Sequence, residues 1–332
     1  MFKSFWVVFF AVVSLAGLTG CQHDLAQTKV IASTFNMTTT FQKNLLEYDA
    51  PKNIDEQRNV RYQLTPPLHF DVYQAQSQDA ARPAPSIVWI HGGGWIAGSK
   101  QHARGYFQRL ADAGYNVIAI EYQFAPEHIY PTQLEQINQA MGYLNRYAAH
   151  YQIDMQNLFF AGDSAGANLA SHYAALVTHP SLAQHEKIQT AIRPEQLRGL
   201  ILHCGIYDLN AFVDTADQQF KIVEWAVLNL VQAYTGGRKQ DAEFLKQISP
   251  IQYLHSAYPA VFISSGNKDF LTKTQAYPFV KALKAQNIPV TEVFYPDSSA
   301  FLMHEYQFFM GKKESQQTFA RTLDFIEQQR VN

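Results

Sequence analysis

The stretch "NLFFAGDSAGAN" (residues 157–168) decides the fold class. It opens with a run of apolar, strand-forming residues and ends in a helical pattern that begins at about Ala165. Between the two lies G-x-S-x-G, which in this setting is typical of a sharp turn that holds its serine out at the top of a sheet. The start of the helix offers backbone N–H groups and a positive dipole end beneath that serine. We therefore predict that Ser164 is a nucleophile.

Strands and helices alternate along the chain on both sides of this turn. Apolar runs predict strands at 68–73, 86–90, 116–122, 158–161, 197–203, 260–264 and 291–295. Helical patterns lie at about 101–113, 132–150, 165–178, 272–286 and 313–329. Several strand candidates are apolar throughout, as expected for strands covered on both faces. The alternation predicts an α/β fold with a mostly parallel, doubly wound sheet.

One connection is longer than the others. Residues 208–249 contain an amphipathic pattern around 219–234. In open α/β folds, ligands bind at the carboxyl edge of the sheet. We therefore predict that this insertion forms a helical cap over that edge. Trp225 of the cap is a candidate to line a substrate pocket, although burial against the sheet is the default for such a residue.

A serine hydroxyl needs a base to take its proton. In folds with this turn, the order along the chain is serine, acid, histidine. His304, in "SSAFLMHEYQF", is the histidine that follows the last strand candidate. Asp269 follows the preceding strand and is the predicted acid, although aspartate in such a place also caps helices. Asp297 is the less favoured alternative, because it lies at a strand end where a turn role is expected.

The stretch "SIVWIHGGGW" (residues 86–95) ends a strand with three consecutive glycines. Each glycine in an ordered element lowers its stability by roughly 0.5–1 kcal/mol relative to alanine. A triplet kept at this cost indicates a backbone that must approach another group closely. Acyl transfer places negative charge on a carbonyl oxygen, which preorganised N–H groups stabilise. The predicted donors are the following residues: Gly92, Gly93, Gly94 and Ala165. We expect His91 to brace the loop, and Trp95 either to line the acyl pocket or to pack.

Together these motifs resemble the α/β-hydrolases of the hormone-sensitive-lipase-like carboxylesterase group, which pairs HGGG with GDSAG. The stretch "EYQFAPEH" (residues 121–128) resembles that group's YRLAPE motif, with Gln123 where arginine is usual. "HGGGW" at 91–95 and "FDVYQ" at 70–74 resemble the related kynurenine formamidase and feruloyl-esterase-like branch. The resemblance covers residues 68–330 and implies hydrolysis of short-chain carboxylic esters without a cofactor or metal.

Two departures from the group leave the substrate class open. The acid loop at 266–271 lacks the usual D-P-L, and His304 is followed by Glu305 and not by glycine. An aryl-formamide or amide hydrolase, or a hydroxycinnamate esterase, would use the same residues. A non-catalytic binding lipoprotein on the hydrolase fold is the alternative from another class.

The N-terminus resembles a lipoprotein leader. Lys3 precedes the apolar residues 5–18, which at 14 residues are too short to span a bilayer; a spanning helix needs about 20 residues. A secretory signal has this pattern. Residues 18–21, "LTGC", resemble a lipobox, so cleavage would leave Cys21 to carry lipid. We expect a signal peptide at 1–20, a tether and partly helical segment at 21–67 and a hydrolase domain at 68–332. The resemblance implies anchoring in a bacterial cell envelope, with Gln22 favouring an outer membrane.

Composition excludes other classes. The net charge is −2 and basic runs are lacking, which argues against a nucleic-acid partner. With Cys21 lipidated, Cys204 has no cysteine to pair with, and we expect it to be a small buried hydrophobic residue. The expected partner is a small-molecule ester, and the oligomeric state is not readable from the sequence.

Overall fold

The computed structural model describes residues 21–76 and 84–331, without the side chains of 21–24. The predicted signal peptide at 1–20 lies outside the described residues. Among the described residues, eight strands form one sheet in the order β1-β2-β4-β3-β5-β6-β7-β8. The strands are β1 (Glu56–Gln63), β2 (Leu68–Tyr73), β3 (Ser86–Ile90), β4 (Asn116–Ile120), β5 (Leu158–Asp163), β6 (Leu197–His203), β7 (Ala260–Ser264) and β8 (Val290–Val293). Pairing is antiparallel for β1 with β2 and for β2 with β4, and parallel for the rest, which confirms the predicted sheet.

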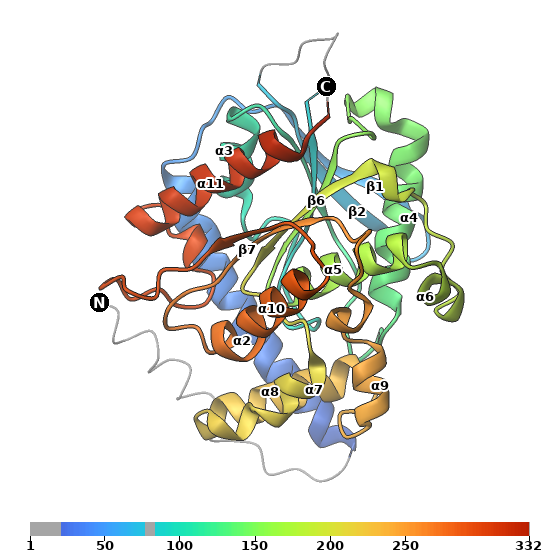
Figure 1. The fold of residues 1–332 in the computed structure, drawn as a ribbon, viewed down its shortest axis with the longest axis vertical. Coiled ribbons are helices and arrows are strands. Elements are labelled where there is room, and N and C mark those ends of the chain that lie inside the picture. The colour runs from blue at the N-terminus through green and yellow to red at the C-terminus, as the bar shows by residue number, and fades with distance from the viewer. Residues whose placement is uncertain (1–20, 77–83, 332) are drawn as a thin grey trace.

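Helices cover both faces of the sheet (Figure 1). One layer is formed by α4 (Thr132–Tyr147), α5 (Ala165–Thr178) and α10 (Tyr277–Ala285), and the other by α3 (Arg104–Asp112) and α11 (Lys313–Gln329). Along β3, Val88 and Ile90 pack into the first layer, whereas Ile87 and Trp89 pack into the second. This two-sided burial explains why the strand is apolar at nearly every position.

The predicted cap lies between β6 and β7 and contains α7 (Leu209–Asp214), α8 (Lys221–Tyr234) and α9 (Ala242–Gln247). These helices gather at one end of the molecule (Figure 1). The short helix α6 (Pro180–His185) follows α5. The long helix α2 (Cys21–Tyr48) contacts both α8 of the cap and α3 beside the sheet. The cap end is therefore built from two separate parts of the chain.

The N-terminal region differs from the sequence-based expectation. Residues expected to begin as a tether are helical from Cys21 onward, and the sheet begins with β1 at Glu56, ahead of the expected domain start at residue 68. Strand β1 has a largely polar sequence, "EQRNVRYQ", because it is an edge strand in which only Tyr62 is buried. An edge strand of this kind shows no continuous apolar run.

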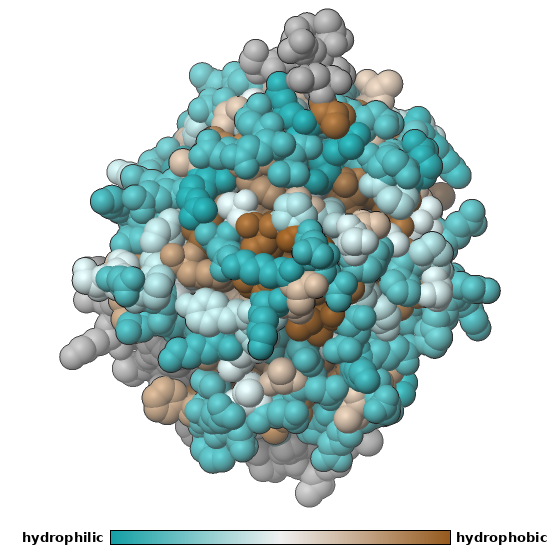
Figure 2. All heavy atoms as spheres, viewed as in Figure 1, coloured by the Kyte–Doolittle hydropathy of each residue, from teal (hydrophilic) through white to brown (hydrophobic). Residues whose placement is uncertain are grey.

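The face shown in Figure 2 is mostly hydrophilic, with hydrophobic residues gathered near its centre, over the region of β7 and α10. Among the described helices, none combines the length and the apolar character that a membrane crossing requires.

Candidate active site

Ser164 occupies a strained turn between β5 and α5. Its backbone has φ 53° and ψ −121°, in a region that non-glycine residues rarely adopt. Its N–H donates to the His203 carbonyl at the end of β6, at 2.9 Å. The turn is tight enough that a Cβ on Gly166 would lie 2.0 Å from the Ile90 carbonyl oxygen. The glycines of G-x-S-x-G are therefore required by close packing, and the serine remains partly exposed.

His304 and Asp269 form a direct pair. The His304 Nδ1–H donates to Asp269 Oδ2 at 2.8 Å. The Asp269 carboxylate is buried and also accepts from the Leu271 N–H at 3.0 Å. The imidazole keeps about a third of its surface exposed. The structure thus brings together the two residues that were predicted as acid and base, and it places Asp297 in an exposed turn.

The end of strand β6 lies between Ser164 and the His304–Asp269 pair. Cys204 follows His203, whose carbonyl accepts from Ser164. The Cys204 thiol lies within 4.8 Å of ligand atoms of both Asp269 and His304. The ends of β5, β6 and β7 therefore meet at one place, as parallel strands require.

Electrostatics favour a charged imidazole. Burial lowers the pKa of His304, but its contacts with Cys204 and Asp269 outweigh this effect, and the pKa stands well above its usual value of 6.5. Burial raises the pKa of the Cys204 thiol to about 11, as expected for a small buried residue. His304, Asp269 and Cys204 are also the described residues that cluster as potential metal ligands. The His304–Asp269 hydrogen bond already pairs two of these three side chains.

The glycine loop requires one correction. Gly92 was predicted as an oxyanion donor, but its N–H donates to Asp163 Oδ2 at 2.9 Å. A Cβ on Gly92 would meet this same carboxylate at 2.4 Å, so this glycine lets the loop approach Asp163. Gly93, with φ 112°, and Gly94, with φ 61°, adopt left-handed conformations that favour glycine. Together with Ala165, they remain the predicted donors.

Asp163 is the functional candidate that the sequence reasoning missed. It is fully buried, and its Oδ1 accepts from Trp89 Nε1 at 2.9 Å and from His102 Nε2 at 3.1 Å. Burial opposes the charge on His102, but the Asp163 carboxylate outweighs it and raises the pKa of His102 to about 9. Although burial disfavours its charge too, the same pairing lowers the pKa of Asp163. The position of Asp163 beside Ser164 was the available signal, whereas nothing in the sequence distinguishes His102.

Glu305 extends this buried charge cluster. Burial and the nearby Asp163 carboxylate raise the pKa of Glu305 to about 7. Its backbone has φ 59°, a left-handed conformation that favours glycine. This conformation gives a physical reason why glycine is usual after the histidine in the group that the sequence resembles.

His91 braces the loop as expected. Its Nδ1 lies 2.7 Å from the Gly92 carbonyl, and its ring stacks on Tyr122 at 4.3 Å. The Tyr122 hydroxyl donates to the His91 carbonyl at 2.9 Å. Burial is the main cause that lowers the pKa of His91 to about 4. A stacked ring of this kind supports the backbone of the glycine loop.

The two tryptophans predicted as pocket residues have packing roles. Trp95 is fully buried and stacks on Tyr234 of α8 at 4.4 Å. Trp225 is partly buried and donates from Nε1 to Gln27 of α2 at 3.0 Å. Both side chains therefore fasten the cap, one to the glycine loop and the other to α2.

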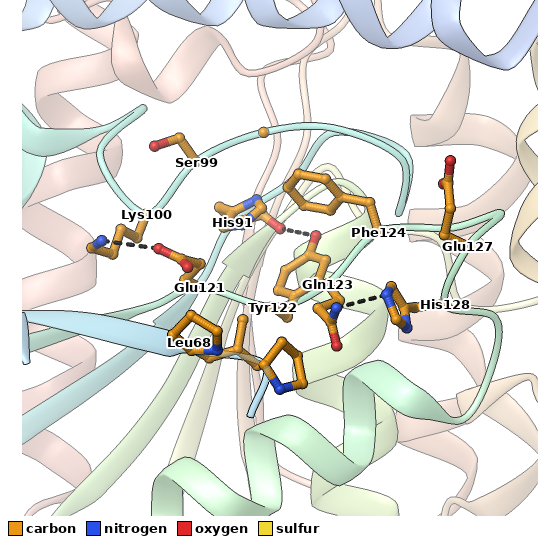
Figure 3. A pocket seen from close by; sticks show the side chains of 13 residues that line it. Leu68, His91, Ser99, Lys100, Glu121, Tyr122, Gln123, Phe124, Glu127 and His128 are labelled. Atoms are coloured by element: carbon orange, nitrogen blue, oxygen red, sulfur yellow. Dashed lines mark hydrogen bonds and ion pairs between the residues drawn. The ribbon is translucent and has the colours of Figure 1, made fainter. Parts of the chain in front are cut away.

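A cavity of about 500 Å³ adjoins the far end of the glycine loop (Figure 3). Its walls include His91, Lys100, Glu121, Gln123 and His128. In Figure 3, Lys100 pairs with Glu121 at 3.0 Å, and Gln123 contacts His128 at 2.6 Å. Ser164, Asp269 and His304 are not among its lining residues, so this cavity is separate from the candidate active site.

One known protein family matches most of the hydrolase region of the chain. The BD-FAE family model matches residues 70–283. The chain belongs to the BD-FAE family. This match spans the glycine loop, Ser164 and Asp269, and it ends before His304.

The curated relatives share less than a third of their aligned residues with this chain. Esterase LipQ of Mycobacterium tuberculosis is 26% identical over 218 residues, which are 65% of this chain and 49% of LipQ. Arylacetamide deacetylase of Oryctolagus cuniculus is 28% identical over 240 residues, 69% of this chain and 56% of that protein. This BD-FAE family member thus spans about half the length of the curated relatives it matches.

Solved structures support the fold. Esterase B of Lactobacillus rhamnosis, in an inhibited form, superposes with a TM-score of 0.77 at 21% identity, covering 92% of this chain and 97% of that one. With the observed sheet order, this likeness confirms the α/β-hydrolase fold.

Proposed function

We propose that this BD-FAE family member is a serine carboxylesterase that cleaves short-chain carboxylic esters through an acyl-enzyme. The observation that carries the proposal is the 2.8 Å contact between His304 Nδ1 and Asp269 Oδ2, at the strand ends where Ser164 is held in its strained turn. The names of the relatives, an esterase and an arylacetamide deacetylase, support hydrolysis of an acyl bond.

Each residue of the site has a defined step in this mechanism. Ser164 Oγ attacks the ester carbonyl while His304 Nε2 takes its proton. Asp269 holds the Nδ1–H tautomer and stabilises the imidazolium that forms. The oxyanion receives hydrogen bonds from the N–H groups of Ala165 and the Gly93–Gly94 backbone. His304 then protonates the leaving alcohol, and water activated by the same base releases the acid.

A ladder of p-nitrophenyl esters from acetate to palmitate tests this proposal. The processed chain, residues 21–332, is expected to hydrolyse the short esters best, and Ser164→Ala is expected to abolish turnover. A fluorophosphonate probe should label the parent chain and not the variant. A flat ladder that Ser164→Ala leaves unchanged would contradict the proposal. Formamides and hydroxycinnamate esters would then be assayed before a binding role is accepted.

The pH profile offers an independent check. His304 must be neutral to accept the Ser164 proton, so kcat/KM falls as pH drops through its pKa. Because the pKa of His304 is raised above 6.5, we expect the acidic limb of kcat/KM to have its midpoint above pH 6.5. A midpoint well below pH 6.5, measured with p-nitrophenyl butyrate, would show that the Asp269 contact does not raise the pKa of His304.

We also propose that the chain is an envelope lipoprotein with its lipid on Cys21. Support comes from the leader pattern at 1–21, an apolar stretch that ends in the lipobox-like residues 18–21. Metabolic labelling with a radioactive fatty acid is expected to mark the parent chain and not Cys21→Ser. Equal labelling of the two chains would contradict this assignment.

A further inference from the structure

The carboxylate of Asp163 collects hydrogen-bond donors from separate parts of the active site. Its Oδ1 accepts from the side chains of Trp89 and His102, and its Oδ2 accepts from the Gly92 N–H of the glycine loop. A carboxylate offers about four lone-pair sites, so these three donors leave room for about one more. Asp163 also directly precedes Ser164. The turn of the nucleophile and the glycine loop are therefore fixed to the same carboxylate.

The side chain of Glu305 supplies a further donor to this carboxylate. It is half-buried and hydrogen-bonds the Asp163 side chain. Two ionised carboxylates have no proton to share, so a hydrogen bond between them requires that one is protonated. The three N–H donors favour the charged form of Asp163. Burial and the Asp163 charge favour the neutral form of Glu305, and they outweigh the opposing effect of the nearby histidines. The proton therefore resides on Glu305, which donates to Asp163.

The loop that carries His304 packs on the same cluster through an apolar contact. A single helical turn, Tyr306–Phe308, follows Glu305, and the Phe308 N–H donates to the Glu305 carbonyl at 3.1 Å. The buried Phe308 ring lies edge-on to the His102 ring, with 5.6 Å between the ring centroids. This packing holds the backbone of Glu305 beside the partners of Asp163, independently of the carboxyl group.

The backbone conformation of Glu305 also points to a role for its side chain. With φ 59°, it is in the left-handed region, which is unfavourable for a residue that has a Cβ. Glycine adopts this conformation at lower cost. Strain of this kind persists where the surrounding structure fixes the residue, as it commonly does at active sites. The hydrogen bond to Asp163 is an interaction that offsets the strain.

We propose that Glu305 is a positioning residue, which donates a hydrogen bond to Asp163 and so fixes the His304 loop to the turn of Ser164. The proposal rests on the esterase function proposed above, in which His304 takes the Ser164 proton. Glu305 acts through Asp163 and through the backbone of His304, and it exchanges no proton with the substrate. A misplacement of about 1 Å can lower a rate about 10²-fold, so this link should affect kcat more than KM.

Two replacements of Glu305 test the proposal. Glu305→Gln keeps a donor in its amide NH₂ group, whereas Glu305→Met has a similar length and no donor. Hydrolysis of p-nitrophenyl butyrate is measured at about pH 6, below the pKa of about 7 to which burial and Asp163 raise Glu305. We expect Glu305→Met to lower kcat about tenfold and to change KM by less than about twofold. Glu305→Gln should keep kcat within about twofold of the parent. Glu135→Met, at an exposed position of α4, is the matched control and should also stay within about twofold.

A double-mutant cycle and an infrared spectrum distinguish positioning from packing. In the Asp163→Ala background, kept under conditions where it is folded, Glu305→Met should lower kcat by less than about twofold further, because the partner of Glu305 is gone. The difference infrared spectrum of the parent minus Glu305→Gln at about pH 6 should contain the C=O stretch of a protonated carboxyl group. The spectrum needs neither a folded Glu305→Met variant nor an ester substrate.

Three results would overturn the proposal. The first is an equal change in kcat, large or small, for Glu305→Gln and Glu305→Met. The second is a loss from Glu305→Met that is undiminished in the Asp163→Ala background. The third is a difference spectrum without the protonated carboxyl band. If the band is present and the parent hydrolyses no ester, the esterase proposal alone fails, and the rate of fluorophosphonate labelling of Ser164 then replaces kcat in the comparison of the variants.

Discussion

Asp269→Asn is expected to lower kcat for p-nitrophenyl butyrate by about 10³- to 10⁴-fold. The carboxylate accepts the His304 Nδ1–H at 2.8 Å, and an amide can turn its NH₂ group toward the ring instead. The imidazole would then adopt the tautomer whose Nε2 carries the proton, and it could no longer accept the Ser164 proton. KM should change little, because the Asp269 side chain is buried and its carboxylate contacts His304.

Asp297→Asn is the matched control for this prediction. Asp297 lies in the exposed turn after β8, seven residues before His304, and was the alternative acid. Its replacement should leave kcat within about twofold, as for ordinary surface substitutions. A large loss in Asp297→Asn, with activity retained in Asp269→Asn, would reverse the assignment of the acid. Far-UV circular dichroism of both variants separates a lost base from a lost fold, because only a lost fold changes the spectrum.

The parallel core of the sheet could be predicted from the sequence because burial on both faces leaves a visible pattern. Strand β3 is apolar at four of its five positions, and its predicted bounds match the observed ones. Strand β1 lacked this signal, since most of its side chains are only partly buried at the sheet edge. The segment at 21–67 was expected to be partly helical, but the bounds of helix α2 were not predicted, for a related reason: its buried side chains include Thr28 and Gln42, polar residues that blur a helical period.

The candidate site was predictable as far as chain order and local motifs determine it. G-x-S-x-G fixes the turn at Ser164, and the order of strands leads to Asp269 and His304. Packing partners that are distant in sequence were not visible. Trp95 meets Tyr234 across 139 residues, and the Gly92 N–H meets Asp163 across 71. Only the folded structure shows that these groups are already engaged.

Asp163→Ala is expected to destabilise the protein by about 3–5 kcal/mol, because it removes one partner of a buried ion pair. It also leaves the Trp89 indole and the Gly92 N–H without their acceptor. The glycine loop then loses its contact with the turn of Ser164, and kcat should fall on the order of 10²-fold. Urea unfolding followed by far-UV circular dichroism measures the loss of stability. Hydrolysis of p-nitrophenyl butyrate without urea, where the variant is folded, measures the loss of kcat.

The pH dependence of this loss distinguishes the ion pair from packing alone. The pKa of His102 is raised from 6.5 to about 9 in the folded protein. Its stabilisation is therefore complete below pH 6.5 and is lost as pH rises through about 9. The difference in unfolding free energy between the parent and Asp163→Ala should shrink over this range. Glu195→Ala, which breaks the exposed pair with Arg193, should change the unfolding free energy by under about 1 kcal/mol. A loss in Asp163→Ala that stays constant from pH 6 to about 9.5 would assign the effect to the Trp89 and Gly92 hydrogen bonds and not to His102.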